Sequence, residues 1–330
     1  MIYIESKSFN PYFNLALEQY VFDNMDRSQE YFLLWQNDNT IVVGKHQNTI
    51  GEINQEFVQD NNISVVRRLS GGGAVYHDRG NLNFTIIVSQ TNKQEDFEFG
   101  RFCQVVVAAL SQLGVKAELN GRNDITIDGK KFSGNSQYMK QGRIMHHGCI
   151  LYDADLTKLS KALKVSKDKI ESKGIKSVVS RVTNVLATMS HKYSLEEFKA
   201  ALVEQMSLTG EMLRHELTAE ELKAIERLQK ERYETWEWNY GASPAYDLVK
   251  ERYIPNCGKI EVHMNVKNGV ICDFDIYGDY FGNGDKKELA EILRGKKINQ
   301  PSLEAALKDV DLNKYLHNMD TQAFIALLLA

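Results

Sequence analysis

The sequence has 330 residues, enough for one large and one small domain, and its 43% hydrophobic and 25% charged residues are typical of a globular protein. A net charge of −4 and a pI near 6.1 exclude a general electrostatic attraction to nucleic acid. No apolar run approaches the ~20 residues that cross a bilayer, and the N-terminus lacks a basic region followed by an apolar stretch, so we expect a cytoplasmic protein without membrane contacts.

The first part of the chain carries one helix signal followed by several strand signals. Asn10-Pro11 is typical of a helix start, and Phe13, Leu17 and Val21 follow at helical spacing. Runs rich in β-branched and aromatic residues predict strands at Tyr31–Trp35, Thr40–Val43, Ser64–Arg68 and Leu82–Val88.

The middle of the chain predicts a helix, a hairpin and a long helical region. Phe102–Leu113 has the pattern of a buried helix that ends before Gly114. Asp128-Gly129 is a favoured tight-turn pair, so we expect a hairpin over Asp124–Gln137. The next expected elements are a strand at Gly148–Tyr152 and helices from Asp155 to about Tyr233.

The pattern breaks around Tyr240–Pro244, which predicts a domain boundary. Beyond it, strand-like runs flank Asn268-Gly269, another hairpin signal, and helical segments complete a small unit. We therefore expect an α/β (α+β) fold. Its large domain, residues 1–245, holds a mixed β-sheet packed by helices, and its small α+β accessory domain covers residues 246–330.

The most informative segment runs from Arg67 to Asp78 and contains Gly71-Gly72-Gly73. Consecutive glycines allow a tight turn or a close approach to a ligand, and their N–H groups can form an anion-binding nest beside the arginines. A plain glycine turn with solvated arginines is equally compatible with the glycines alone. The segment matches neither G-x-x-x-x-G-K-[ST] nor a G-x-G-x-x-G that opens a helix, which argues against a P-loop NTPase and a Rossmann dehydrogenase.

Several ordered blocks give a more specific indication. The segment R-R-x-S-G-G-G-A-V-[YF]-H-D-x-G-N resembles the signature of lipoate–protein ligases. Three further blocks are similar to the same family and lie in its order: Gly121–Asp124 leading to Lys131–Gly134, His146–Gly148, and Lys173–Val182. The resemblance spans nearly the whole chain, including the appended C-terminal domain of the two-domain ligases.

The resemblance implies a fold related to biotin ligases, with the ligand between the sheet and the loops. Lys131 is the implied catalytic lysine, and it would bind both the nucleotide and lipoate. The other implied nucleotide contacts are Arg68, Asp124, Gly73, Ala74, Val75 and Tyr76. Lipoate is expected near Gly73, His77 and His147, and secondary contacts are expected from Asn83, Ser177 and Arg181.

Several of these assignments leave alternatives open. Asp124 is a candidate for the adenosine end or for Mg²⁺, but a turn or capping role is also compatible with it. His77 and His147 are as compatible with hydrogen-bonded structural histidines. Val179 stands where many relatives carry an arginine, so one charged contact with the phosphates or the acceptor is expected to be missing.

A fixed lysine suits the implied chemistry. A carboxylate that attacks the α-phosphorus of ATP brings two anions together, and an ammonium group with Mg²⁺ offsets that charge. The resulting lipoyl-AMP would be attacked by the amine of an acceptor lysine, with AMP leaving and without an enzyme nucleophile. Lys130 fits a solvated surface lysine, and without the resemblance the sequence does not separate it from Lys131.

We therefore expect ATP, Mg²⁺ and lipoic acid as substrates and activator, and no tightly bound prosthetic group. The expected protein partners are apo lipoyl domains of 2-oxo-acid dehydrogenase acyltransferase subunits or the H protein of glycine cleavage. The small domain is expected to swing between the activation step and the transfer step.

Candidate walls for the lipoyl tail are Leu17, Leu69, Val75 and Phe84, each also compatible with a residue of the ordinary hydrophobic core. A cluster of Trp236, Trp238 and Tyr240 is expected to dock the small domain or cap the large one.

Other functions of the same fold remain as alternatives. A lipoyl- or octanoyl-transferase would use an activated cysteine, but the matching interval Lys167–Lys173 contains none. Cys149 is predicted to be a buried strand cysteine, and the scattered cysteines predict neither a zinc site nor disulfides. Two further alternatives are an enzyme that accepts lipoyl-AMP without making it and a non-catalytic lipoyl- or nucleotide-binding module. A biotin ligase is also compatible with the fold, but the arginine–glycine phosphate loop of biotin ligases differs from R-R-L-S-G-G-G.

Overall fold

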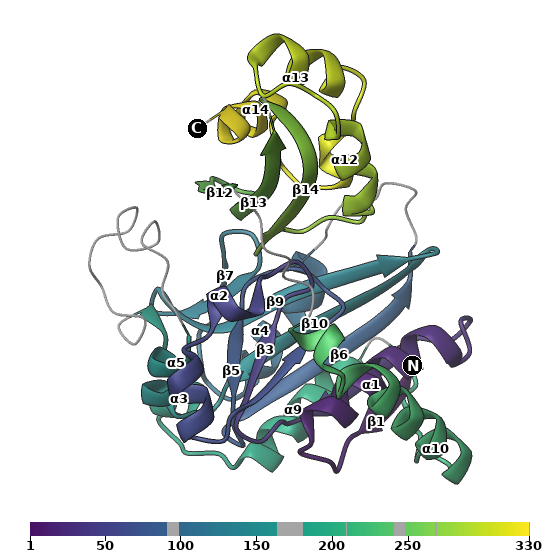
Figure 1. The fold of residues 1–330 in the computed structure, drawn as a ribbon. Coiled ribbons are helices and arrows are strands. Elements are labelled where there is room, and N and C mark those ends of the chain that lie inside the picture. Colours follow the sequence, from purple (N-terminus) through teal and green to yellow (C-terminus); the bar gives the residue numbers. More distant parts are fainter. Residues whose placement is uncertain (91–98, 164–180, 209, 241–247, 268, 330) are drawn as a thin grey trace.

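The computed structural model describes the chain except residues 91–98, 164–180, 209, 241–247, 268 and 330. A large domain holds two sheets, and a small domain stands against one end of it (Figure 1). The main sheet has the order β11-β1-β2-β6-β10-β9-β8-β7 and is mixed, because β1 pairs in parallel with both neighbours whereas β6, β10, β9 and β8 pair antiparallel. Its strands are β1 (Ile2–Glu5), β2 (Tyr31–Trp35), β6 (Asn81–Ser89), β7 (Glu118–Asn120), β8 (Asp124–Ile127), β9 (Lys130–Lys140), β10 (Arg143–Leu151) and β11 (Leu213–Arg214).

Helices cover both faces of the main sheet. Successive side chains of a strand point to opposite faces, so a strand that is apolar throughout needs a core on each side. Phe84 of β6 belongs to the hydrophobic core on one face and Ile87 to the core on the other. The first face is covered by α4 (Gly100–Gln112) and α9 (Leu195–Ser207), and the second by α1 (Pro11–Asn24) and α10 (Ala219–Leu228). The predicted mixed sheet packed by helices is therefore confirmed.

A second sheet, in the order β4-β3-β5, lies beside α1 over the second face of the main sheet. Val42 packs toward α1 and the main sheet, whereas Ile41 packs toward the outer helices. The strands are β3 (Thr40–Val43), β4 (Ser64–Arg67) and β5 (Val75–His77), and the nearby helices are α2 (Thr49–Glu52), α3 (Gln55–Asp60) and α5 (Leu156–Ala162). Residues 68–74, which we call the glycine loop, join β4 to β5.

Several local predictions are confirmed and one is corrected. Helix α1 begins at Pro11, with Asn10 Oδ1 accepting a hydrogen bond from the Tyr12 N–H at 2.9 Å. Asp128 and Gly129 have φ angles of 49° and 73°, as a two-residue turn between β8 and β9 requires. The helical region after residue 155 is interrupted by β11, which forms because it pairs in parallel with β1. Among the residues described after position 180, this region also holds α8 (Val185–Thr188), α11 (Trp236–Asn239) and the π-helical turn η1 (Gln229–Tyr233).

The small domain packs three helices on one face of an antiparallel sheet, around a separate hydrophobic core. Its elements are β12 (Leu248–Ile254), β13 (Gly258–Lys267), β14 (Val270–Gly278), α12 (Lys286–Leu293), α13 (Gln300–Leu307), the 3₁₀ turn η2 (Leu312–Lys314) and α14 (Thr321–Leu329). The predicted hairpin joins β13 to β14, with Gly269 at φ 72°. The boundary expected at residue 245 lies outside the described residues.

The two domains are held together near the glycine loop. Phe281 follows β14 but packs in the core of the large domain, with its ring 5.4 Å from the Phe99 ring. The guanidinium of Arg122 lies 4.2 Å from the Phe281 ring centroid and donates to the carbonyl of Cys257 at 2.9 Å. In the part of the chain that the structure describes, no helix is long and apolar enough to span a bilayer.

Candidate functional site

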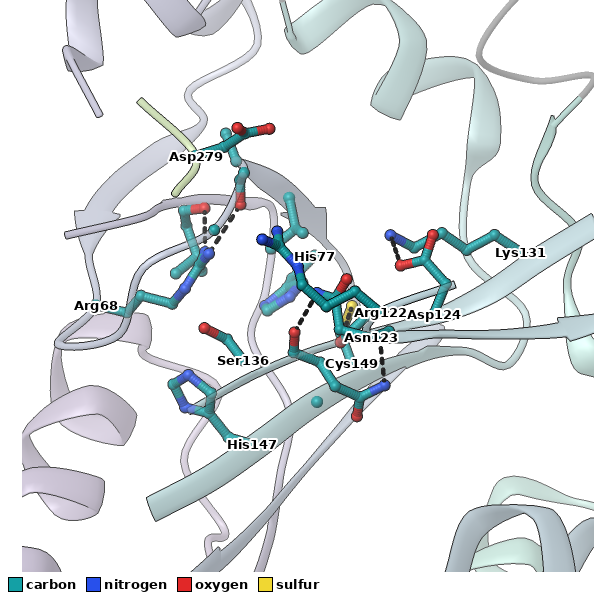
Figure 2. Close-up of a pocket in the computed structure, with 18 of the residues that line it drawn as sticks. Arg68, His77, Arg122, Asn123, Asp124, Lys131, Ser136, His147, Cys149 and Asp279 are labelled. Atoms are coloured by element: carbon teal, nitrogen blue, oxygen red, sulfur yellow. Dashed lines mark hydrogen bonds and ion pairs between the residues drawn. The ribbon is translucent and has the colours of Figure 1, made fainter. Parts of the chain in front are cut away.

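A cavity of about 330 Å³ lies between the second face of the main sheet, the glycine loop and the small domain. Figure 2 shows Lys131 and Asp124 pointing toward each other on one side of it, with Arg68 and His147 on the other. Most of the residues predicted from the sequence line this one cavity, namely Arg68, Gly73, Ala74, Val75, His77, Asp124, Lys131, His147 and Arg181.

Two expected site residues, Tyr76 and Asn83, are not among those that line the cavity, and a third lies outside the described residues. Tyr76 points into the core between the second sheet and the outer helices, and its hydroxyl donates to Asn39 Oδ1 at 2.9 Å. Asn83 is buried in the sheet below the cavity, with 1% of its surface exposed. Ser177, like Val179, lies outside the described residues.

A single row of paired residues crosses the main sheet beneath the cavity. Trp35, Asn83, Cys149, Gly134 and Asp124 are successive register partners on β2, β6, β10, β9 and β8. Directly opposed residues share a face, and neighbouring strands lie ~4.8 Å apart, so the row spans roughly 19 Å. The cavity therefore has an apolar end near β2 and a charged end near β8.

The apolar end differs from the walls expected for a lipoyl tail. Of the four candidates only Val75 lines the cavity, together with Leu15, Trp35 and Val42. The other three candidates, Leu17, Leu69 and Phe84, belong to the hydrophobic cores beside it.

A β-bulge aims Lys131 into the charged end. Ile125 pairs with Ser133, but the next residue, Thr126, pairs with Lys131, so Phe132 is an extra residue in β9. Strict alternation from Gly134 would turn Phe132 toward the cavity and Lys131 toward the core. The bulge reverses this, because Phe132 is fully buried in the core and Lys131 lines the cavity.

Lys131 is held in place by its partners. Its Nζ lies 2.7 Å from Asp124 Oδ1, and its carbonyl accepts a hydrogen bond from the Thr183 N–H at 2.9 Å. Gly134 leaves room for the side chain, since a Cβ there would lie 2.9 Å from the Lys131 Nζ. Burial lowers the pKa of Lys131, but the charge and hydrogen bond of Asp124 raise it by more, so the net pKa lies above its ordinary value and the amine stays protonated.

The two arginines before the glycines have different roles. Arg67 lies away from the cavity and donates to the carbonyls of Gly44 and Gln47 at 2.8 and 2.7 Å. Arg68 shapes the glycine loop itself, because its Nη2 donates to the carbonyls of Gly71 and Gly73 at 2.7 and 2.9 Å. Burial lowers the pKa of each guanidinium to about 10, so both remain charged at neutral pH.

A buried hydrogen-bond network anchors the glycine loop to the sheet. Arg68 Nε, which can only donate, bonds to Ser70 Oγ at 3.1 Å, and Ser70 Oγ lies 2.6 Å from His147 Nε2. A carboxylate oxygen can only accept, so His147 Nδ1 carries a proton and donates to Glu18 Oε1 at 2.9 Å. The buried Glu18 carboxylate is thus the terminal acceptor of a network that links the glycine loop to the sheet.

The sequence reasoning missed several residues that line the cavity. Asp279 and Tyr253 come from the small domain, and Arg122 and Ser136 come from the large one. Cys149 was predicted to be buried in a strand, but its side chain is half-buried and lies on the cavity floor. Arg122 lies within one of the blocks that carry the family resemblance and Cys149 directly follows another, whereas no local pattern marks Asp279 or Tyr253.

The aromatic cluster after η1 belongs to the large domain. Trp238 Nε1 donates to the Arg67 carbonyl at 2.8 Å, and Arg67 Nε donates back to the Trp238 carbonyl at 3.0 Å. This reciprocal pair ties the cluster to the end of β4 within the large domain. Within the described residues no group of three His, Cys, Asp or Glu side chains forms a metal site.

Comparisons with known proteins agree on one family. Residues 10–207 match the family described as lipoyl protein ligase A/B catalytic domain, and residues 243–328 match the bacterial lipoate protein ligase C-terminus. Lipoate-protein ligase LplJ of Bacillus subtilis is 44% identical over 99% of this chain and 100% of its own length.

Two solved structures share the fold. A bi-partite lipoate protein ligase from Thermoplasma acidophilum, studied with its E2 lipoyl domain, has a TM-score of 0.64 at 28% identity, over 75% of this chain and 98% of that one. A lipoate-protein ligase A bound with ATP has a TM-score of 0.62 at 27% identity, over 73% of this chain and 98% of that one.

Proposed function

The chain belongs to the lipoate–protein ligase family, and on this premise we propose that it activates lipoate with ATP as lipoyl-AMP and transfers the lipoyl group to a lysine of an acceptor protein. The observation that carries the proposal is the Lys131 ammonium, which Asp124 holds at 2.7 Å at the charged end of a cavity whose other end is apolar. An acid with an apolar tail matches this polarity.

The cavity supports one orientation of the acid. The carboxylate lies at Lys131, above Gly134, and the acyl chain runs over Cys149 toward Trp35. β9 and β2 are three strand spacings apart, roughly 14 Å, which suits an acyl chain of medium length. The buried end then excludes water from the tail, and the charged end faces the nucleotide.

The first step joins the carboxylate to the α-phosphorus of ATP, as the ATP-bound relative supports. A carboxylate oxygen attacks phosphorus, the bond to the bridging oxygen breaks, and pyrophosphate leaves. The protonated Lys131 lies between the two anions and offsets the charge that develops on the phosphoryl oxygens. The backbone of the glycine loop, held by Arg68, lines the other side of the same cavity.

Mg²⁺ would enter with the nucleotide. Mg²⁺ is usually bound by one or two carboxylates together with substrate phosphates, and the cavity carries the carboxylates Asp124 and Asp279. Either carboxylate offers the oxygen ligand that Mg²⁺ takes beside substrate phosphates and would hold the ion. When bound, it neutralises charge on the phosphates.

The second step moves the lipoyl group to the acceptor. The neutral amine of the acceptor lysine attacks the carbonyl carbon of the mixed anhydride, AMP leaves, and the amine proton passes to solvent. We propose apo lipoyl domains of 2-oxo-acid dehydrogenase acyltransferase subunits as acceptors, supported by the relative studied with its E2 lipoyl domain, and the H protein of glycine cleavage as a second acceptor. The four free thiols suit a reducing compartment, so we propose a cytoplasmic location.

The small domain moves between the two steps in this proposal. In the docked arrangement the Gly72 N–H faces the Tyr280 carbonyl at 3.4 Å, so the small domain competes for a donor of the glycine loop. Gly71 has no room for a Cβ, which would lie 2.3 Å from that carbonyl. A nucleotide that uses these N–H groups favours a shift of the small domain. Ligand-free and adenylate-bound structures with the same domain placement would contradict this motion.

One observation favours an acyl transferase as a second candidate function. Cys149 lies on the cavity floor, and a transferase would use a cysteine there to carry the acyl group.

The proposal is tested by intact-mass analysis of an apo lipoyl domain that is incubated with this protein, lipoate and Mg²⁺, with and without ATP. A lipoyl mass increase only with ATP supports the ligase. Modification only when lipoyl-AMP or a lipoylated donor protein is supplied would support a transferase instead.

A further inference from the structure

One buried side chain in the cavity carries a polar atom without a partner. His77 lines the cavity and has 3% of its surface exposed. Its Nε2 has no hydrogen-bond partner among the described residues of the chain. A buried polar atom without a partner costs free energy, so this nitrogen points to a ligand group that completes it.

The hydrogen bonds behind His77 fix which ring nitrogen carries the proton. Asn14 Nδ2 faces the carbonyl of Gln36 at 2.7 Å, so this end of the amide donates. The same amino group donates to Asn37 Oδ1 at 3.0 Å, which turns the amino group of Asn37 toward His77 Nδ1 at 3.3 Å. His77 Nδ1 is therefore an acceptor.

A neutral imidazole that accepts at Nδ1 carries its proton on Nε2. Burial, followed by the charge of Arg68, lowers the pKa of His77 to about 3, so the ring is neutral at physiological pH. His77 thus offers the cavity a single uncharged N–H donor.

His77 lies at the apolar end of the cavity, remote from the reacting groups. Its ring centroid is 6.3 Å from that of Trp35, which stands at the β2 end of the floor. Lys131 belongs to β9, three strand spacings or roughly 14 Å away across the sheet. An acid whose carboxylate lies at Lys131 therefore presents the far end of its chain to His77.

We propose that the His77 Nε2–H recognises the dithiolane ring of lipoate and makes the site prefer lipoate to octanoate, an inference that rests on the proposed function and deepens it. A dithiolane sulfur is a weak hydrogen-bond acceptor, whereas the end of octanoate offers only C–H groups. Octanoate therefore leaves the buried donor unpaired, and a site built around a donor rejects an analogue that lacks the acceptor. No atom of the reaction centre takes part in this selection.

The test compares kcat/KM for lipoate and octanoate in the ATP-dependent acylation of an apo lipoyl domain, for the wild type, His77→Leu and His77→Gln. We expect the lipoate-to-octanoate ratio of kcat/KM to fall about tenfold in His77→Leu, equivalent to about 1.4 kcal/mol. His77→Gln keeps an N–H donor and should retain most of the preference. The ratio makes each variant its own control for folding and for the activation chemistry.

The outcomes separate this inference from the proposed function. A ratio that is the same in all three proteins would overturn the role of His77, even with full ligase activity. A parallel fall for both acids would do the same, because it would give His77 only a structural role. A wild type that acylates with neither acid would instead refute the proposed ligase activity.

Discussion

Replacing Lys131 by alanine removes the ammonium group that lies 2.7 Å from Asp124 Oδ1 at the charged end of the cavity. The two side chains are 40% and 37% exposed, so solvent screens their attraction and the pair contributes less than about 1 kcal/mol to stability. We therefore expect Lys131→Ala to fold and to unfold at nearly the same denaturant concentration as the wild type.

The effect on catalysis should be far larger. Loss of one preorganised donor at a developing charge lowers kcat by about 10²–10³, equivalent to about 2.7–4 kcal/mol. The Asp124 carboxylate, left unpaired in the cavity, would also repel the carboxylate and phosphate groups of the substrates. We expect lipoyl-AMP synthesis to fall by at least 10³-fold on these two grounds.

The assay is release of pyrophosphate and formation of lipoyl-AMP, measured beside urea unfolding. Lys130→Ala is the matched control, because Lys130 is exposed and precedes Lys131 on the same strand. It should retain wild-type rates. Lipoyl-AMP synthesis by folded Lys131→Ala at the rate of the Lys130→Ala protein would refute the role assigned to Lys131.

Three further predictions follow from the same geometry. Asp124→Asn removes the carboxylate that raises the pKa of Lys131, so this pKa should fall and Lys131 should lose its proton at a lower pH. A pH profile should then show lipoyl-AMP synthesis falling at lower alkaline pH than in the wild type, and coincident profiles would contradict this. Cys149→Ala should retain most ATP-dependent lipoylation of an apo lipoyl domain, measured by intact mass, whereas its loss would indicate a thioester intermediate. Phe281→Ala deletes a ring that packs in the core of the large domain and under Arg122, at a cost of about 3–5 kcal/mol. Because Phe281 belongs to the small domain, small-angle scattering should show a larger radius of gyration, and an unchanged radius would argue against this docking contact.

The elements predicted from the sequence are those with strong short-range signals. Asn10-Pro11 begins a helix because a cap and a fixed φ act within one turn, and Asp128-Gly129 forms a turn because both residues accept positive φ. β1 and β11 were not predicted, since such short strands are defined by their partners rather than by their own residues.

The family resemblance located most of the cavity, because the blocks that carry it include the glycine loop, Asp124, Lys131 and His147. It named Arg68 and not Arg67 as a site residue, but it placed both Tyr76 and His77 in the site. Arg67 and Arg68 are adjacent in the sequence, yet only Arg68 lines the cavity. Tyr76 and His77 are likewise adjacent, and the alternation of β5 turns only His77 toward the cavity.

The sequence by itself determined the helix and strand periodicities, the tight turns, the glycine loop and the family, because each depends on residues close together in the chain. Only the tertiary structure decided that a bulge at Phe132 turns Lys131 toward Asp124, and that Asp279 of the small domain completes the cavity. It also decided the proton position on His77, which a chain of amides reaching back to Asn14 sets. These features depend on strand register and on contacts between distant segments, and no local pattern of residues encodes them.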